Sequence, residues 1–345
     1  MCALAVALAA IWAPQVLLAQ MDAQEVSSVR LIAETERVHA GQTILLGLHL
    51  DMDEGWHTYW DGRNDTGQPP LVRWTLPEGV RIGPMLWPAP SRYVSPGDIL
   101  DHVYEGRATI VVPVTIQPGL PAGTELPIRA EVEWLVCKDV CLPGVATVAT
   151  TLRVVPMGNA TPLEPTPLDP SSPIGQAVQR LPVPILPADA PQGQPGQDAS
   201  GSTVPLTLRW QDQAVVVQAD GAQALAFYPS ARCVWLADPL RDAQAQGPTL
   251  TLRLARPEDD LSGASERRLR GVIEVQAESG RSWYAVDFGP DGLRRPESAE
   301  WMQHARSRLA GEGPAVPAPP SEDARSQDEG ANTPPPARGI DAGGP

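Results

Sequence analysis

Short apolar runs, each closed by a turn, dominate residues 26–155. Within a run, apolar and polar residues alternate, as in Val29-Arg30-Leu31, which is the period of a half-buried β-strand. The other runs lie at 43–50, 56–60, 72–76, 108–116 and 126–136. Turns of the Pro-Glu-Gly, Pro-Gly and Pro-Ala-Gly kind separate them. This spacing predicts an all-β fold, with a β-sandwich of about 130 residues.

The last run leads directly into a pair of cysteines. Residues 131–144 read EVEWLVCKDVCLPG, so Cys137 ends a strand and Cys141 follows three residues later. Leu142-Pro143-Gly144 then reads as a turn, and a second β-like run covers 145–155. The pair therefore lies in or beside the turn of a hairpin. Its spacing lets the two Cα atoms reach the range of about 4.4–6.8 Å that a disulfide needs.

The spacing of this pair differs from that of thioredoxin. A thioredoxin-type pair has two intervening residues and opens a helix, whose N-terminus lowers the pKa of one thiol. Here three residues intervene, and Pro143-Gly144 leaves no helix to begin. If the pair is redox-active, we expect a partner to supply the activated thiolate and this disulfide to be the group that is attacked.

Spacing alone does not separate a reactive pair from a structural one. Closing a ring of about five residues stabilises a fold by only about 2 kcal/mol, which weighs modestly against a structural role. Short rings also tend to be the reducible ones. Lys138 would favour a neighbouring thiolate and Asp139 would oppose it, although residues of both kinds are more often simply solvated in a turn. On the residues alone, the two interpretations stand about even.

The rest of the chain divides by composition. Residues 157–201 are rich in proline and predict a stiff, extended linker, with one or two helical turns at 174–181. Residues 202–292 contain five further β-like runs and predict a second, smaller β-sandwich. A weak helix is expected over 296–309, and the composition of 311–345 predicts a disordered tail. Cys233 stands alone in the second β-rich part, where a thiol is usually a buried apolar side chain.

The first residues predict export. Residues 2–19 form an apolar run broken by Pro14 and Gln15, and the first charged residue is Asp22. We interpret residues 1–19 as a signal peptide, with the mature chain starting near Gln20. An uncleaved anchor is the alternative, because about 18 apolar residues are the lower limit for a membrane span.

Charge and motifs exclude several classes of function. A formal net charge of −15 disfavours nucleic acid or an anionic membrane surface as a partner. The sequence has no zinc-type cysteine pairs, P-loop, dinucleotide fingerprint or GxSxG motif. We therefore expect no cofactor. Closely spaced cysteines agree with export, since disulfides persist outside the cytosol.

Several blocks of residues resemble one known family. The segment Trp134 to Pro143 is similar to the cysteine motif of the DsbD N-terminal domain family, in the variant of ScsB-like proteins. Four upstream blocks resemble the same family in the same order, namely 55–60, 74–79, 87–90 and 104–106. The resemblance implies an immunoglobulin-like redox domain over 25–156. Cys137 and Cys141 would be its catalytic residues, relaying reducing equivalents as a disulfide.

The resemblance also implies partners and a cover for the site. A membrane-embedded thiol reductase would supply electrons, and periplasmic thioredoxin-like or disulfide isomerase proteins would receive them. Relatives of the whole DsbD kind continue into membrane helices and a thioredoxin-like domain. This sequence has neither, so we expect the donor to be a separate protein and any membrane contact to be indirect. The loop 87–104, with Tyr93 and Tyr104, is a candidate lid over the cysteines. The five tryptophans of this domain are expected mostly in its core.

Three functions remain in competition. The first is a periplasmic thiol–disulfide interchange module of the protein-disulfide reductase type. The second is a protein-binding sandwich with a structural disulfide. The third is a copper-binding module, since ScsB-like proteins are associated with copper tolerance, and two thiolates with His57 or His102 would suit a soft ion. Nothing in the sequence brings either histidine near the pair. The first function is favoured.

Overall fold

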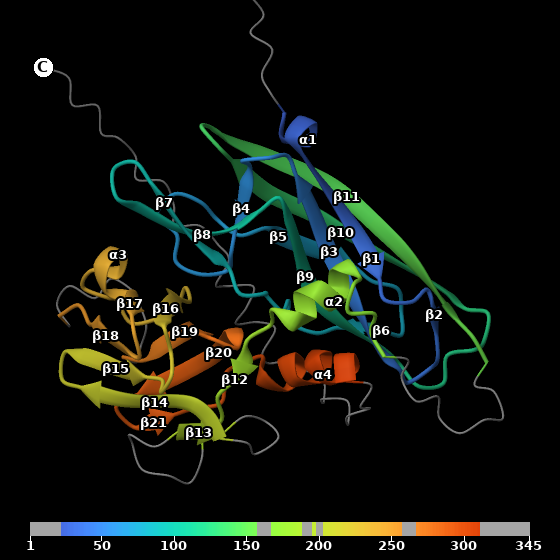
Figure 1. Ribbon diagram of the computed structural model, residues 1–345. Helices are drawn as coiled ribbons and strands as arrows, with labels where there is room; N and C mark the ends of the chain where they lie inside the picture. The colour runs from blue at the N-terminus through green and yellow to red at the C-terminus, as the bar shows by residue number, and fades with distance from the viewer. Residues whose placement is uncertain (1–21, 157–166, 188–194, 198–202, 257–266, 311–345) are drawn as a thin grey trace, which may run out of the picture.

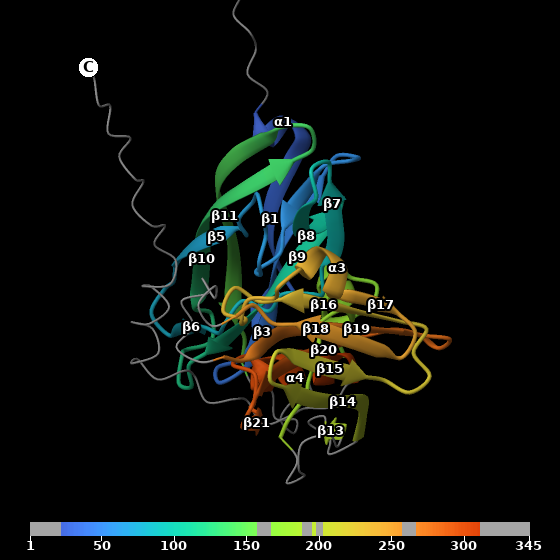
Figure 2. The same ribbon diagram turned by 90° about the vertical axis from the view of Figure 1, so that its left-hand side faces the viewer.

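The computed structural model describes residues 22–156, 167–187, 195–197, 203–256 and 267–310. The expected signal peptide, the expected tail and three parts of the expected linker (157–166, 188–194 and 198–201) lie outside the described residues. The described residues fold into two β-rich parts. Figure 2 shows the second part below the first, with the strands of the two parts running in different directions.

The first part is a sandwich of two sheets. One sheet has the strand order β1-β3-β9-β6, and the other has the order β2-β11-β10-β4-β8-β7, with β5 paired to β10. The strands are β1 (Ser27–Ala33), β2 (Arg37–Val38), β3 (Thr43–Met52), β4 (His57–Tyr59), β5 (Leu71–Thr75), β6 (Val80–Ile82), β7 (Ser91–Ser95), β8 (Ile99–Glu105), β9 (Arg107–Ile116), β10 (Glu125–Cys137) and β11 (Cys141–Val154). The short helix α1 (Ala23–Val26) precedes β1.

Strands with one face towards water alternate between buried and exposed residues. Strands with both faces covered are buried along almost their whole length. Along β10, Ile128, Val132 and Val136 are buried in the core while Arg129 and Glu131 face water. Strands β3 and β9 are instead buried almost throughout, because helices cover their second face.

The second part also has two sheets. Their strand orders are β12-β20-β19-β16-β17, with β21 paired to β20, and β13-β14-β15-β18. The elements are α2 (Pro173–Gln179), β12 (Val183–Pro184), β13 (Pro195–Gln197), β14 (Thr203–Gln211), β15 (Ala214–Gln218), β16 (Ala224–Pro229), α3 (Pro239–Asp242), β17 (Gln244–Gln246), β18 (Thr249–Arg253), β19 (Leu269–Ala277), β20 (Gly280–Gly289), β21 (Gly292–Leu293) and α4 (Ala299–Ala310). The expected all-β fold, a sandwich followed by a smaller β-rich part, is confirmed. The expected helix over 296–309 corresponds to α4.

The prediction of an extended, unpacked linker is wrong for residues 167–187. Helix α2 forms there, as the expected turns at 174–181 suggested, and its Ile174 and Val178 are buried. They share an apolar cluster with Leu45 and Val111 of the first sandwich and with Trp301 of α4. Figure 1 shows α2 and α4 side by side along the first sandwich. Proline content marked the segment as a poor helix former, but burial of these apolar side chains stabilises the helix.

The two parts share a continuous core. Tyr228 and Val272 of the second part are buried in the same apolar cluster as Trp60 and Trp134 of the first. Of the five tryptophans expected in the core, Trp56, Trp60 and Trp134 are buried, whereas two are only half-buried, namely Trp74 and Trp87. The second part therefore packs directly against the first sandwich through buried apolar side chains.

Candidate functional site

The two cysteines close the β10–β11 hairpin. Cys137 is the last residue of β10, Cys141 is the first residue of β11, and the two are paired in the strand register. Their sulfur atoms form a disulfide, with the Cα atoms 4.2 Å apart. The hairpin predicted from the sequence is therefore present, and its loop consists of residues 138–140. The expected turn at Leu142-Pro143-Gly144 is wrong, because these three residues belong to β11 and pair with β10.

The two halves of the disulfide have different surroundings. Cys137 is buried, with 2% of its surface exposed, and it packs with Tyr59 and Val103. Cys141 is exposed. Half-buried Tyr93 and Leu135 complete the cover over Cys137. Cys141 is therefore the half of the disulfide that is more open to an incoming group.

The region predicted as a lid forms a hairpin. Strands β7 and β8 pair with each other, and β8 pairs with β4 beside the cysteines. Tyr93 contacts the ring of His57 at a centroid distance of 4.5 Å. Tyr104, the other aromatic side chain of this region, is turned inward and donates to the Pro88 carbonyl at 2.6 Å. Tyr93, but not Tyr104, is thus part of the cover.

His57 lies beside Cys137, a proximity that no pattern in the sequence predicted. The register pairs His57 of β4 with Cys137 of β10, so their side chains are on the same face of the sheet. His57 is buried, and burial lowers the pKa of its imidazole. Among the residues that the structure describes, none forms a hydrogen bond with its Nδ1. A neutral imidazole with an available nitrogen therefore lies on the buried side of the disulfide.

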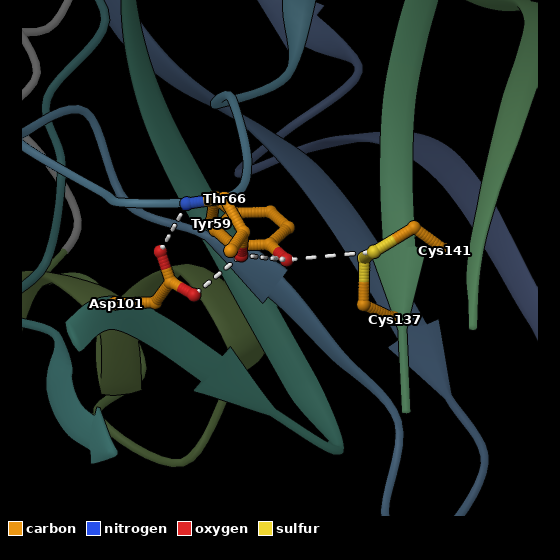
Figure 3. The surroundings of a disulfide bond; sticks show 5 residues. All are labelled: Tyr59, Thr66, Asp101, Cys137 and Cys141. Atoms are coloured by element: carbon orange, nitrogen blue, oxygen red, sulfur yellow. Dashed lines mark hydrogen bonds between the residues drawn. A yellow bond between two sulfur atoms is a disulfide. The ribbon is translucent and has the colours of Figure 1, made fainter. Parts of the chain in front are cut away.

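A second polar group approaches the exposed sulfur. The hydroxyl of Tyr59 lies 3.7 Å from Cys141 Sγ and 3.4 Å from Thr66 Oγ1. Thr66 Oγ1 in turn donates to Asp101 Oδ2 at 2.6 Å, and the backbone N–H of Thr66 donates to Asp101 Oδ1 at 3.0 Å. Figure 3 shows this series of contacts leading from Asp101 to the disulfide. Burial raises the pKa of Tyr59, so its hydroxyl keeps its proton and can donate it.

These three residues were not singled out in the sequence. Tyr59 belongs to the block at 55–60 and alternates with His57, so its face could have been assigned from the strand period. Thr66 and Asp101 come together only because β8 pairs with β4, and no local signal marks that pairing.

The remaining candidates have structural contacts. Lys138 Nζ donates to the Glu54 carbonyl at 3.2 Å, and Asp139 is exposed in the loop. His102 is buried away from the cysteines, where its Nδ1 lies 2.6 Å from the Arg63 carbonyl and its ring contacts Tyr228. Cys233 is buried in the core of the second part, as a lone thiol in a strand-rich region usually is. Of the two histidines considered as ligands, only His57 is near the pair.

No helix within the described ranges is long and apolar enough to cross a membrane. No group of three or more metal-ligand side chains suited to a metal ion occurs in that same part of the chain.

Comparison with known proteins agrees with this site. Residues 28–153 match the family described as thiol:disulfide interchange protein DsbD, N-terminal. The comparison with curated proteins gave no match. Among solved structures, the N-terminal periplasmic domain of ScsB from Proteus mirabilis is 16% identical, with a TM-score of 0.46, over 78% of this chain and 96% of that one. The reduced N-terminal domain of DsbD from Neisseria meningitidis is 11% identical, with a TM-score of 0.23, over 40% of this chain and 91% of that one.

The matched segment contains both cysteines, the strand β4 beside them and the β7–β8 hairpin that covers them. The resemblance to the DsbD N-terminal domain family is therefore confirmed for residues 28–153, a thiol–disulfide interchange domain that carries the Cys137–Cys141 disulfide.

Proposed function

We propose that this chain is an exported thiol–disulfide interchange protein of the periplasm. It relays reducing equivalents through Cys137 and Cys141, from a membrane-embedded thiol reductase to periplasmic thioredoxin-like or isomerase proteins. The apolar run at 2–19 and the persistence of disulfides outside the cytosol support the location. The single observation that carries the proposal is the asymmetric disulfide at the hairpin end, with Cys141 exposed and Cys137 buried.

The difference in burial supports a different role for each sulfur. A donor thiolate attacks Cys141 Sγ, the S–S bond breaks, and its electron pair leaves on Cys137 Sγ as a thiolate. The second thiol of the donor then attacks the donor sulfur of this mixed disulfide. Cys141 is released as a thiolate, and the donor is left with a disulfide of its own. Two electrons have passed to this chain. In the next transfer the Cys141 thiolate attacks the disulfide of an acceptor, and Cys137 resolves the mixed disulfide by attacking Cys141 Sγ.

This assignment predicts that the two single cysteine variants behave differently. Cys137→Ser keeps the exposed nucleophile but lacks the resolving thiol, so it should accumulate a covalent complex with an oxidised acceptor. Cys141→Ser keeps only the buried thiol and should trap far less. The measurement is non-reducing electrophoresis after each full-length variant is incubated with periplasmic extract, with mass spectrometry of the bands. Cys233→Ser is the matched control and should exchange like the wild type.

A structural disulfide would give the opposite result. Neither variant would form a complex, and the wild-type disulfide would resist a thioredoxin-like donor. Its reduction potential would then lie below about −300 mV, as it does for structural disulfides of secreted proteins. That combination would refute the relay. Both variants should still fold, because a five-residue ring contributes only about 2 kcal/mol.

A soft-metal site is a second candidate function. The described residues hold no group of three metal ligands while Cys137 and Cys141 are joined, but reduction would free both thiols beside His57. After reduction, two thiols and an imidazole whose Nδ1 has no hydrogen bond among the described residues lie along one row of the sheet. Thiolate and imidazole ligands suit copper(I). This function predicts that the reduced chain takes copper(I) from a chromogenic chelator and that His57→Asn weakens the uptake. The oxidised chain is the control, and equal behaviour of the oxidised and reduced chains would refute the site.

A further inference from the structure

The loop between β4 and β5 connects the second β-rich part to the first sandwich. Arg63, in this loop, donates through Nη2 to the Cys233 carbonyl, and its guanidinium lies 4.0 Å from the centre of the Trp235 ring. The backbone N–H of Arg63 donates to the Pro229 carbonyl at 3.0 Å. All three partners belong to the segment 229–235 of the second part. A charged hydrogen bond combined with a cation–π contact fixes a guanidinium in both position and orientation.

The residues after Arg63 are tied to β8 one by one. Asn64 Oδ1 accepts from the backbone N–H of His102 at 2.7 Å, and Asp65 Oδ2 accepts from that of Leu100 at 2.7 Å. Thr66 bonds to Asp101 through both its hydroxyl and its backbone N–H. The loop therefore follows β8 in a fixed register. Only Asn64 and Asp65 separate Arg63 from Thr66 in the chain.

The hydrogen bond of Thr66 to Asp101 limits the acceptors that are available to the Tyr59 hydroxyl. Because the hydroxyl hydrogen of Thr66 is used by Asp101, its oxygen can only accept from Tyr59. The single hydrogen of Tyr59 therefore has two acceptors, Thr66 Oγ1 and Cys141 Sγ. When Cys141 becomes a thiolate, the charged sulfur is the stronger acceptor. Thr66 holds the Tyr59 oxygen within reach of the sulfur in the meantime.

We propose that Arg63 is a positioning residue through which the second β-rich part holds Thr66 and Tyr59 in place for thiolate formation at Cys141. Arg63 contacts neither cysteine, and it acts through the loop. The second part is then a working component of the redox site. The inference rests on the proposed exchange at Cys141, and it adds a role for residues outside the segment that matches the family.

The test is the pH dependence of alkylation at Cys141. The full-length chain is reduced and treated with iodoacetamide between pH 5 and 9, and modified Cys141 is quantified by mass spectrometry of its peptide. Only the thiolate reacts, so the profile reports how well the site stabilises it. For Arg63→Ala we expect the midpoint to move to higher pH and the rate at pH 7 to fall about threefold to tenfold, because a hydrogen bond to a charged group is weakened. Arg63→Lys, which keeps a cation near Trp235, should recover part of the loss.

A second variant separates positioning from folding. Trp235→Leu lies in the second part and removes the ring under the guanidinium, so it should move the profile in the same direction. If Arg63→Ala loses its near-ultraviolet circular dichroism signal, that variant has lost its tertiary packing. The alkylation profile of Trp235→Leu then decides alone whether the second part positions Thr66 and Tyr59. Arg153→Ala removes an exposed arginine that pairs with Glu125 at the other end of the hairpin, and it should leave the profile unchanged.

The outcomes distinguish this inference from the function on which it rests. Folded Arg63→Ala and Trp235→Leu chains with the wild-type profile would overturn the role of Arg63, whether or not the wild type exchanges with partners. Failure of the wild type to exchange with any thiol protein would overturn the proposed function. The alkylation profile would still report what positions Tyr59.

Discussion

Replacing Arg308 by methionine is expected to destabilise the folded chain by about 3–5 kcal/mol, the usual cost of removing one partner of a buried ion pair. Arg308 lies on α4 with 4% of its side chain exposed and bonds through Nη2 to Glu34 Oε1, whose side chain is 7% exposed. The other oxygen of Glu34 accepts from the backbone N–H of Leu45 at 3.0 Å. Methionine would fill the volume but would leave the Glu34 carboxylate buried without its cation. Chemical denaturation at neutral pH measures the loss.

The matched control removes both charges. In a Glu34→Gln and Arg308→Met double variant, the amide oxygen still accepts from Leu45 and no buried charge is left over. Most of the lost stability should therefore return. Arg73→Ala, which breaks an exposed pair with Glu133, should cost no more than about 1 kcal/mol. If Arg308→Met is as mild as Arg73→Ala, the Glu34–Arg308 pair does not hold α4 in place.

This ion pair also bears on the surroundings of the Cys137–Cys141 disulfide. Helices α2 and α4 share one apolar cluster with the first sandwich, and Ala285 of β20 belongs to the same cluster. The expectation of a stiff, extended linker is therefore wrong for residues 167–187. Loosening α4 should weaken the association of the two parts, on which the contacts of Arg63 depend.

The local part of the site could be predicted from the sequence. Alternation predicted the face of Val132 and Val136, and the pair of cysteines was expected in or beside the turn of a hairpin, although the turn itself lies at 138–140 and not at 142–144. The quoted blocks also identified the family over 28–153. Each of these features depends on residues that are close in the chain, where period and turn chemistry decide the structure.

The surroundings of the disulfide depend on contacts between distant residues. His57 reaches Cys137, and Asp101 reaches Thr66, through strand pairings that no local pattern specifies. Helix α2 forms in a proline-rich segment because its apolar face is buried against β3 and β9. Tertiary burial outweighed local composition in that segment. The contacts of Arg63 likewise depend on distant residues, and no motif in the sequence marks them.

Acidification is expected to destabilise the protein well before its carboxylates are neutral. Burial lowers the pKa of His102 to about 4 and that of His304, on α4, also to about 4. An unfolded histidine titrates near pH 6.5. Between these values the unfolded chain binds protons that the folded chain does not, so folded-state stability falls as the pH drops from about 6.5 to 4. Each histidine can contribute roughly 3 kcal/mol to that loss.

His102 is the more informative of the two because it touches the loop of Arg63. Its Nδ1 lies 2.6 Å from the Arg63 carbonyl, which fixes the proton on Nδ1 and leaves Nε2 buried with no hydrogen bond to any described residue. Protonation of Nε2 would place a positive charge close to that of Arg92, and this repulsion also lowers the pKa of His102. The carboxylates of Asp101 and Asp65 act in the opposite direction and raise it. Acid should therefore release the loop that carries Thr66 at the same time as it weakens the fold.

The test compares the wild type with His102→Asn by urea denaturation from pH 7 to pH 4. Asparagine keeps a donor near the position of Nδ1 and does not titrate. The variant should be less stable at pH 7, because it leaves part of the imidazole volume empty, but it should lose less stability on acidification. His304→Asn should reduce the pH dependence separately, and the two reductions should add, because the sites share no partner in the structure. A wild type and a His102→Asn variant with the same loss between pH 7 and pH 4 would show that His102 is protonated as readily in the folded chain as in the unfolded one.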